Sequence, residues 1–176
     1  MLKLAPPAYR YCPFCSKPLS TRSEEGHQRR YCPACNWTYY PRVASSVSAI
    51  ICDNNQTLLV KRRRDPFKGT WMFPSGFVDF GEHPDDTVAR EVKEETGLTL
   101  QSANLLGVFQ SDDDFREFGQ FVFFYRVTAQ AGDLQNDDQE NEAIGWFPVS
   151  SPPEIGLKLH RLFMEELAQG RLAVLG

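Results

Sequence analysis

Residues 76–98 read GFVDFGEHPDDTVAREVKEETGL and carry the strongest structural signal in the chain. Pro84 suits the first turn of a helix, because the N–H that it lacks would have no partner there in any case. Two aspartates follow it, where negative charge favours the positive end of the helix dipole. Gly97 is a favourable C-terminal stop. The stretch therefore predicts a helix from Pro84 to Thr96.

Three acids of this predicted helix, Glu91, Glu94 and Glu95, fall within an arc of about 100°. Like charges at this spacing oppose helix formation, so a positive group is expected against them. Carboxylate oxygens that gather at the edge of a buried face suit Mg²⁺ or Mn²⁺, which prefer oxygen ligands. The local pattern leaves one alternative open, a solvated acidic face with an ion pair between Arg90 and Glu94.

The wider spacing favours the metal site. The specified positions are Gly76, five residues, Glu82, seven residues, Arg90-Glu91-Val92, one residue, Glu94-Glu95, one residue and Gly97-Leu98. This arrangement resembles the Nudix box, and the similarity covers roughly residues 43–150. The resemblance implies an α/β (α+β) fold, the α/β/α sandwich of that family around a mixed sheet.

The resemblance also implies roles for the residues of the box. Glu91, Glu94 and Glu95 would bind the catalytic metal. The backbone carbonyl of Gly76 would be a further ligand, and glycine allows a backbone geometry there that other residues resist.

Two further pairs of residues have counterparts in the family. Arg90 and Glu82 resemble its supporting pair, in which the arginine steers the acids and a carboxylate holds the arginine. Nudix enzymes often supply another ligand or the general base from a loop before a Trp-Phe strand. Glu140 and Glu142 precede Trp146-Phe147 and are the candidates here, although one of the box glutamates could also be the base.

Four cysteines near the N-terminus form two pairs, Cys12-Pro-Phe-Cys15 and Cys32-Pro-Ala-Cys35. Their spacing is that of a four-thiolate zinc ribbon, and two disulfides or a redox dithiol are the alternatives. The segment is too short to build its own core, so bound Zn²⁺ would supply most of its folding energy. Four thiolates fill the coordination shell, which makes this zinc structural.

Composition and charge set the domain organisation. Hydrophobic residues make up 41% of the 176 residues and charged residues 24%, which is typical of a globular protein. Residues 1–42 carry a net charge of +5 and residues 43–176 a net charge of −9. We therefore expect a zinc ribbon at 1–42 and a Nudix hydrolase domain at 43–176. The chain shows neither an apolar run of membrane-spanning length nor a signal-peptide core, so a cytoplasmic protein is expected.

Patterning outside the box predicts strands over 43–52, 57–62, 105–110 and 120–127, and a helix over 157–169. The basic run 61–64 is a solvated strand end or a contact to a substrate phosphate. Phe109, Phe115 and Phe121 either pack in the core or stack on a nucleobase. His160 is expected at a surface or packing position.

These features predict metal-dependent hydrolysis of the diphosphate linkage in a nucleoside diphosphate derivative, which releases a nucleoside monophosphate. The resemblance implies a dinucleotide cofactor such as NADH or FAD, or ADP-ribose. The Ser-Gln-Pro-Trp-Pro-Phe-Pro motif of NADH pyrophosphatases has no counterpart at 111–119, so a preference for NADH does not follow.

Two other functions and one assembly state stay open at this stage. The chain could be a nucleic-acid-binding or ligand-sensing Nudix protein that uses the basic ribbon, or a hydrolase of nucleotide-capped RNA. The family is often dimeric, so a homodimer is compatible with the resemblance.

Overall fold

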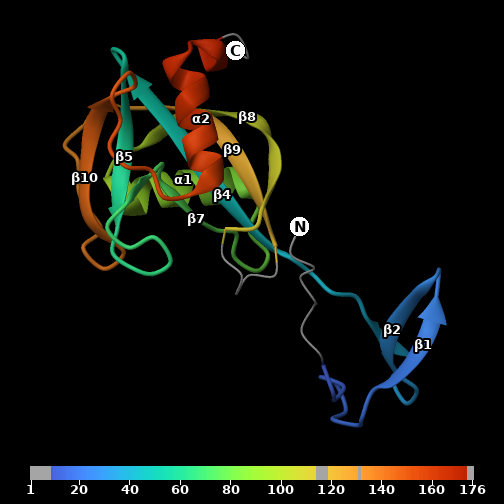
Figure 1. Cartoon of the computed structure of the whole chain (residues 1–176). Coiled ribbons are helices and arrows are strands. Elements are labelled where there is room, and N and C mark those ends of the chain that lie inside the picture. Colours follow the sequence, from blue (N-terminus) through green and yellow to red (C-terminus); the bar gives the residue numbers. More distant parts are fainter. Residues whose placement is uncertain (1–8, 114–118, 131, 174–176) are drawn as a thin grey trace. The chain divides into compact units, whose positions relative to one another are not determined.

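The computed structural model describes residues 9–113, 119–130 and 132–173, and the chain divides into two compact units, Met1–Val43 and Ala44–Gly176. In the smaller unit, the antiparallel strands β1 (Ser20–Glu24), β2 (His27–Cys32) and β3 (Trp37–Tyr39) pair in that order (Figure 1). Its buried cluster contains only Cys12, Leu19 and Cys32 among the described residues. So small a core agrees with the expectation that a metal must stabilise this unit.

The larger unit is built on one mixed sheet with the strand order β10-β5-β4-β9-β8. Its strands are β4 (Ala44–Asp53), β5 (Gln56–Arg62), β8 (Leu100–Ser111), β9 (Gln120–Ala129) and β10 (Asn141–Pro148). Two short strands join it, β6 (Trp71–Met72) on β5 and β7 (Ser75–Phe77) on β4. The β4–β9 pair is parallel and the other pairs are antiparallel.

Helices α1 (Pro84–Thr96) and α2 (Lys158–Ala168) lie on opposite faces of this sheet, as Figure 1 shows, and a short 3₁₀ helix, η2 (Arg171–Ala173), follows α2. The α/β/α sandwich expected from the sequence is therefore confirmed. Among the described residues, no helix has the length and apolar character needed to cross a membrane.

Most strands begin and end close to their expected residues, but β8 begins at Leu100 instead of Leu105. β8 is the edge strand of the sheet, and its first half carries the polar residues Gln101, Ser102 and Asn104. An edge strand needs no continuous apolar pattern, because part of it faces water. Hydrophobic alternation therefore could not reveal this half of the strand.

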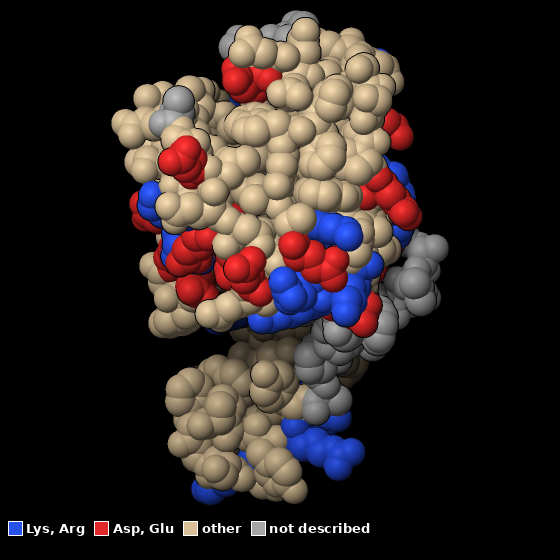
Figure 2. Space-filling model, turned by 90° about the vertical axis from the view of Figure 1, so that its left-hand side faces the viewer, with Lys and Arg blue, Asp and Glu red and all other residues tan. Residues whose placement is uncertain are grey.

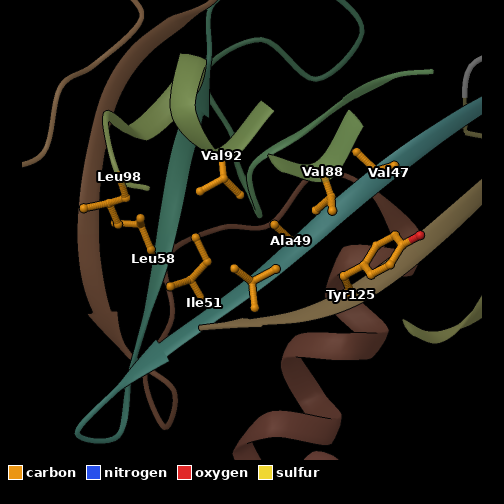
Figure 3. Close-up of a cluster of buried hydrophobic side chains, with 9 residues drawn as sticks. Val47, Ala49, Ile51, Leu58, Val88, Val92, Leu98 and Tyr125 are labelled. Atoms are coloured by element: carbon orange, nitrogen blue, oxygen red, sulfur yellow. The ribbon is translucent and has the colours of Figure 1, made fainter. Parts of the chain in front are cut away.

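Helix α1 is fixed to the sheet by an apolar cluster (Figure 3). Val88 and Val92 are fully buried and pack against Val47, Ala49 and Ile51, which alternate along β4 toward the same face. Burying a side chain of this size stabilises the fold by roughly 1.5–3 kcal/mol. Because the apolar stripe is held against β4, the glutamates lie at the border of this buried face.

Helix α2 covers the opposite face. Phe163 stacks on Phe124 of β9 with ring centroids 4.0 Å apart. His160 is 4% exposed, lies against the rings of Phe73 and Phe124, and its Nδ1 accepts a hydrogen bond from the backbone N–H of Phe73 at 3.1 Å. The packing interpretation of His160 is therefore confirmed.

The burial of His160 predicts a loss of stability in mild acid. Burial, with a contribution from the charge of Arg62, lowers the pKa of His160 to about 3, whereas an unfolded chain keeps it near 6.5. Between these two pKa values the unfolded state is protonated at His160 and the folded state is not. The contribution to stability is therefore complete above pH 6.5 and is lost as the pH falls toward 3. We expect His160 to reduce the free energy of unfolding by about 2 kcal/mol between pH 7.5 and pH 5.

Denaturant unfolding at the two pH values measures this effect. His160→Gln keeps an acceptor for the Phe73 N–H and cannot titrate, so its stability should depend less on pH than that of the wild type. His27→Gln, at an exposed histidine of β2, is the matched control and should retain the wild-type dependence. Equal pH dependence in His160→Gln and the wild type would refute the assignment.

Candidate functional site

The acidic helix begins and ends as its sequence predicts. His83 caps the N-terminus, with its Nδ1 accepting from the Asp85 N–H, and Gly97 ends the helix in the left-handed conformation with φ of 75°. The Tyr125 hydroxyl of β9 donates to Asp85 Oδ1 at 2.6 Å and ties the first turn to the sheet. These contacts fix the rotation of α1, which determines where its acids point.

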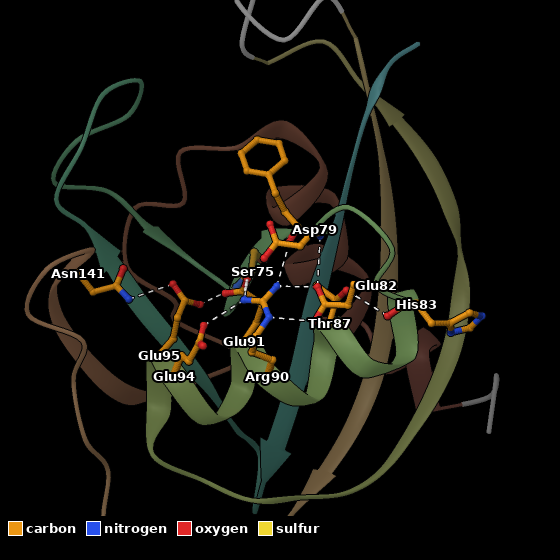
Figure 4. Close-up of polar contacts among 11 residues, drawn as sticks. Ser75, Asp79, Glu82, His83, Thr87, Arg90, Glu91, Glu94, Glu95 and Asn141 are labelled. Carbon is orange, nitrogen blue, oxygen red and sulfur yellow. Dashed lines mark hydrogen bonds and ion pairs between the residues drawn. The ribbon is translucent and has the colours of Figure 1, made fainter.

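Arg90 lies at the centre of a network of carboxylates, with Glu82 on one side and Glu91 and Glu94 on the other (Figure 4). Its guanidinium donates twice to Glu82, from Nε and Nη2, both at 2.9 Å. Nη1 donates to Glu91 at 2.7 Å and to Glu94 at 3.0 Å, and Nη2 also donates to the Phe77 carbonyl at 3.1 Å. The contact expected between Arg90 and Glu82 is thus present.

The ion pair between Arg90 and Glu82 shifts the pKa values of both side chains. The Arg90 guanidinium holds the pKa of the Glu82 carboxyl at about 2, and Glu82 in turn raises the pKa of Arg90. The pair therefore remains charged at neutral pH, and a bidentate arginine is a rigid support.

Glu91 packs against the loop that precedes the helix. Its carboxylate occupies the space beside Gly76, where an added Cβ would clash with Glu91 Oε1. The φ of Gly76 is outside the left-handed region, so the sequence-based reason for this glycine was wrong. Glycine is needed because the backbone approaches a carboxylate closely, which is one of its recognised uses.

Glu95 is the most buried of the three acids, at 2% exposure. Its Oε2 accepts from the Ser75 N–H at 2.7 Å, and its Oε1 accepts from the Asn141 side-chain amide at 3.0 Å. Sequence reasoning did not single out Asn141, although it lies between the two candidates Glu140 and Glu142. Only its burial, which depends on long-range packing, distinguishes it.

The structure separates Glu140 from Glu142. Glu140 lines the same cleft as Glu91 and Glu95, and its charge contributes to raising the pKa of both. The carboxylate of Glu142 is paired with Lys61 at 3.3 Å. The pairing of β10 with β5 is irregular between Asn141 and Ala143, so residues two apart do not point the same way here.

Some of the predicted site residues line a cleft of about 460 Å³ in the larger unit, and Glu82, Glu94 and Glu142 are not among its lining residues. Its size is typical of small-molecule sites. Gly76, Arg90, Glu91, Glu95 and Glu140 line it. From the basic run, Arg62 and Arg64 also line the cleft, whereas Lys61 pairs with Glu142. Viewed toward β10, acidic and basic side chains are interspersed over this unit (Figure 2).

Of the aromatic candidates, Phe109 packs on Phe124 and Phe163, Phe121 is 43% exposed, and Phe115 lies outside the described residues. Core packing therefore accounts for Phe109 alone.

The acids of α1 offer the oxygen donors that a divalent cation prefers. Burial raises the pKa of Glu91 and raises that of Glu95 to about 8, with Glu140 adding to both effects, so a nearby cation would relieve an unfavourable charge. Asn141 Oδ1 is buried and has no hydrogen-bond partner among the described residues. Glu91, Glu94 and Glu95 do not gather as tightly as the cysteines do, because Arg90, Ser75 and Asn141 hold their oxygens.

The four cysteines of the smaller unit do converge. The Sγ atoms of Cys12, Cys15, Cys32 and Cys35 all lie within 4.8 Å of one another, and the Cys15 and Cys32 sulfurs are 3.6 Å apart. All four are free thiols, and a disulfide would need a separation near 2.05 Å. Tetrahedral Zn²⁺ with Zn–S distances of about 2.3 Å places its sulfurs about 3.8 Å apart. The cluster therefore fits a zinc site and excludes disulfides in this structure.

Comparison with known proteins identifies relatives of this chain. A family model described as the NUDIX domain matches residues 42–167. The ADP-ribose pyrophosphatase of Methanocaldococcus jannaschii is 33% identical over 126 residues, 72% of this chain and 74% of that protein. The NAD-capped RNA hydrolase NudC of Chromobacterium violaceum is 28% identical over 160 residues. The mitochondrial NAD(P)H pyrophosphatase NUDT13 of Homo sapiens is 30% identical over 156 residues.

The matches to NudC and to NUDT13 each cover 88% of this chain, but only 57% of NudC and 42% of NUDT13. Among solved structures, a MutT NUDIX hydrolase from Burkholderia pseudomallei is 31% identical, with a TM-score of 0.64 over 69% of this chain and 95% of that one. A NUDIX hydrolase from Nitrosomonas europaea has a TM-score of 0.73 over 93% of this chain and 94% of that one. At 23% identity, this second likeness shows the fold alone.

Proposed function

This chain belongs to the Nudix family, and on that premise we propose that it is a divalent-metal-dependent pyrophosphohydrolase. Its substrate is a nucleoside diphosphate derivative, which it cleaves at the diphosphate linkage to release a nucleoside monophosphate. The observation that carries this proposal is the cleft that the buried Glu91 and Glu95 line. Glu91 lies beside Gly76 and accepts from Arg90, which Glu82 holds in turn. Glu95 is held by Ser75 and Asn141.

In this proposal, acidic residues would bind the metal and basic residues would bind the substrate. Glu91, Glu94 and Glu95 hold Mg²⁺ or Mn²⁺, with the Gly76 carbonyl as a further ligand. Such an ion, when bound, neutralises charge on a diphosphate and lowers the pKa of a water molecule. Arg62 and Arg64 line the same cleft, and a guanidinium is well suited to phosphate oxygens.

We assign the general base to Glu140, because it lines the cleft, where it pairs with Arg64 at 3.6 Å, whereas Glu142 pairs with Lys61 and is not among the residues that line the cleft. Glu140→Gln is expected to lower kcat by a factor of about 10² to 10⁴, since that is the usual contribution of a positioned acid or base. Glu142→Gln is the matched control and should keep kcat close to that of the wild type. Steady-state kinetics of both variants decides the assignment, and the opposite pattern would transfer the role to Glu142.

The substrate class follows from the names of the relatives. These name ADP-ribose, NAD(P)H and NAD-capped RNA, all of which contain a nucleoside diphosphate. We therefore propose ADP-ribose or a dinucleotide such as NADH or FAD as the substrate. Incubation of the protein with these compounds and Mg²⁺ or Mn²⁺, followed by identification of the products, tests the proposal.

A second candidate function is the hydrolysis of nucleotide-capped RNA, or binding of nucleic acid without hydrolysis. The observations in its favour are the name of the NudC relative and the surface of the ribbon. Tyr11, Phe14 and Tyr40 are 61%, 73% and 52% exposed, and residues 1–42 carry a net charge of +5. Exposed rings and positive charge suit single-stranded nucleic acid. Binding that weakens steeply with salt would support this candidate.

We propose Zn²⁺ as the structural ion of the ribbon and a division into a ribbon at 1–42 and a hydrolase domain at 43–176. We also propose a cytoplasmic location, because paired cysteines there more often bind metal than form disulfides. A homodimer is compatible with the resemblance, and light scattering of the purified protein tests it.

A further inference from the structure

A second buried carboxylate lies in the wall of the cleft, on a different element from the acids of α1. Asp113 follows the end of β8, and its side chain is 4% exposed, whereas that of the neighbouring Asp112 is 56% exposed. Asp113 lines the same cleft as Glu91 and Glu95. Burying a carboxylate is unfavourable unless its oxygens are hydrogen-bonded, so the partners of each oxygen are informative.

One oxygen of Asp113 is firmly held. Oδ2 accepts from the Ser111 hydroxyl at 3.2 Å and from the backbone N–H of Lys158, the first residue of α2, at 3.1 Å. The Ser111 oxygen in turn accepts from the Asp113 N–H at 3.3 Å. Donors from β8 and α2 therefore fix the orientation of the carboxylate.

The other oxygen, Oδ1, is buried and has no hydrogen-bond partner among the described residues. The Lys158 ammonium lies 4.0 Å from it and makes its shorter contact, 2.8 Å, with Asp112. Buried acceptors in proteins are almost always hydrogen-bonded, and a donor brought by a ligand would satisfy this one. Asp113 lines the cleft, which indicates that this ligand is the substrate.

We propose that Asp113 determines specificity by accepting, at Oδ1, a hydrogen bond from a donor on the nucleoside of the substrate. This inference rests on the proposed function, since it takes the acids of α1 as the site of the phosphates. The donor is the amino group of a base or a hydroxyl group of the sugar. A carboxylate repels carbonyl and phosphate oxygens, so it selects donors at this point of the cleft.

The hydrogen bonds at Oδ2 predict the behaviour of Asp113→Asn. The Ser111 hydroxyl and the Lys158 N–H both need an acceptor, so the asparagine oxygen takes the Oδ2 position. Its NH₂ group then takes the Oδ1 position, where a donor replaces an acceptor. The variant should therefore prefer nucleosides that present an acceptor, and the selectivity of the cleft changes instead of merely weakening.

Calorimetric titration of the full chain with nucleoside monophosphates in Mg²⁺ tests this proposal, because binding is measured without turnover. AMP carries both kinds of donor, IMP has a carbonyl in place of the amino group, and 2′-deoxy-AMP and 3′-deoxy-AMP each lack one hydroxyl. The wild type should bind AMP about ten to a hundred times more tightly than the analogue that lacks the group donating a hydrogen bond to Asp113.

The variant identifies the source of the donor. If the base supplies it, Asp113→Asn should bind IMP more tightly than AMP; if the sugar supplies it, the difference between AMP and the deoxy analogue should disappear. Asp112→Asn makes the same chemical change at the exposed neighbour and should keep the wild-type ratios. Comparing ratios removes the effect of a lower folded fraction, which changes all four affinities by the same factor, so unchanged ratios in the variant count against the proposal.

Two outcomes would overturn the proposal: equal affinity of the wild type for all four nucleotides, including no measurable binding at millimolar ligand, or wild-type ratios in Asp113→Asn. Failure of the proposed function is seen separately, in hydrolysis assays on the same preparation. Selective binding without turnover would refute the hydrolase function and support the role of Asp113. Turnover with equal affinities would support the hydrolase function and refute the role of Asp113.

Discussion

Glu94→Gln is expected to lower hydrolytic turnover about a thousandfold, since the charge stabilisation supplied by a catalytic metal is worth several kcal/mol and each 1.36 kcal/mol is a factor of ten. Glu94 is the informative position, because its side chain is 54% exposed and its partner among the described residues is Arg90 at 3.0 Å. Surface ion pairs of this kind contribute about 0–1 kcal/mol to stability. The variant should therefore fold normally, unlike variants at the buried Glu91 and Glu95.

Thermal unfolding and steady-state kinetics of the same preparation separate the two effects. Glu165→Gln makes the same substitution at an exposed position of α2 and should retain full activity. A folded Glu94→Gln protein with wild-type turnover would remove Glu94 from the metal site.

Cys32→Ser is expected to release the zinc and unfold the smaller unit while the larger unit stays folded. Structural Zn²⁺ supplies about 10–16 kcal/mol of folding free energy, more than a unit with so few buried residues gains by packing. Cys32 is 0% exposed and lies at the end of β2, so its loss removes a ligand and disturbs the core together. Metal analysis should find about one zinc in the wild type and much less in the variant.

Hydrogen exchange along the chain shows which part unfolds. Amides of 9–43 should lose protection in Cys32→Ser, and those of β4 and β9 should keep it. Cys52→Ser is the control, because Cys52 is an exposed thiol outside the cluster. A zinc-free wild-type protein with a fully protected ribbon would contradict the assignment.

Local chemistry explains which features could be predicted from the sequence. The bounds of α1 follow from a proline in its first turn and a glycine at its end, and the structure places both as expected. The contact between Arg90 and Glu82 was expected from the resemblance to the Nudix box and is present as two hydrogen bonds. Both features depend on residues that are close in the sequence.

The remaining features depend on contacts between distant segments. Asn141 bonds to Glu95 across 46 positions of sequence, and Asp113 is held by the backbone of Lys158 across 45. Glu140 and Glu142 could not be separated by alternation, because the irregular pairing at the start of β10 breaks the two-residue period. Neither burial nor strand irregularity leaves a local signal that a single sequence can reveal.

The measurement that tests the central claim most directly is a metal-dependent hydrolysis screen with identified products. The full chain is incubated in Mg²⁺ or Mn²⁺ with ADP-ribose, NADH, NAD⁺, FAD, diadenosine polyphosphates and nucleoside triphosphates. We predict that one nucleoside diphosphate derivative is strongly preferred and is cleaved at the diphosphate to give a nucleoside monophosphate. This activity should disappear with EDTA and return with excess Mg²⁺. Failure of the folded, metal-loaded protein to cleave any of these compounds, or turnover unaffected by EDTA, would contradict the account.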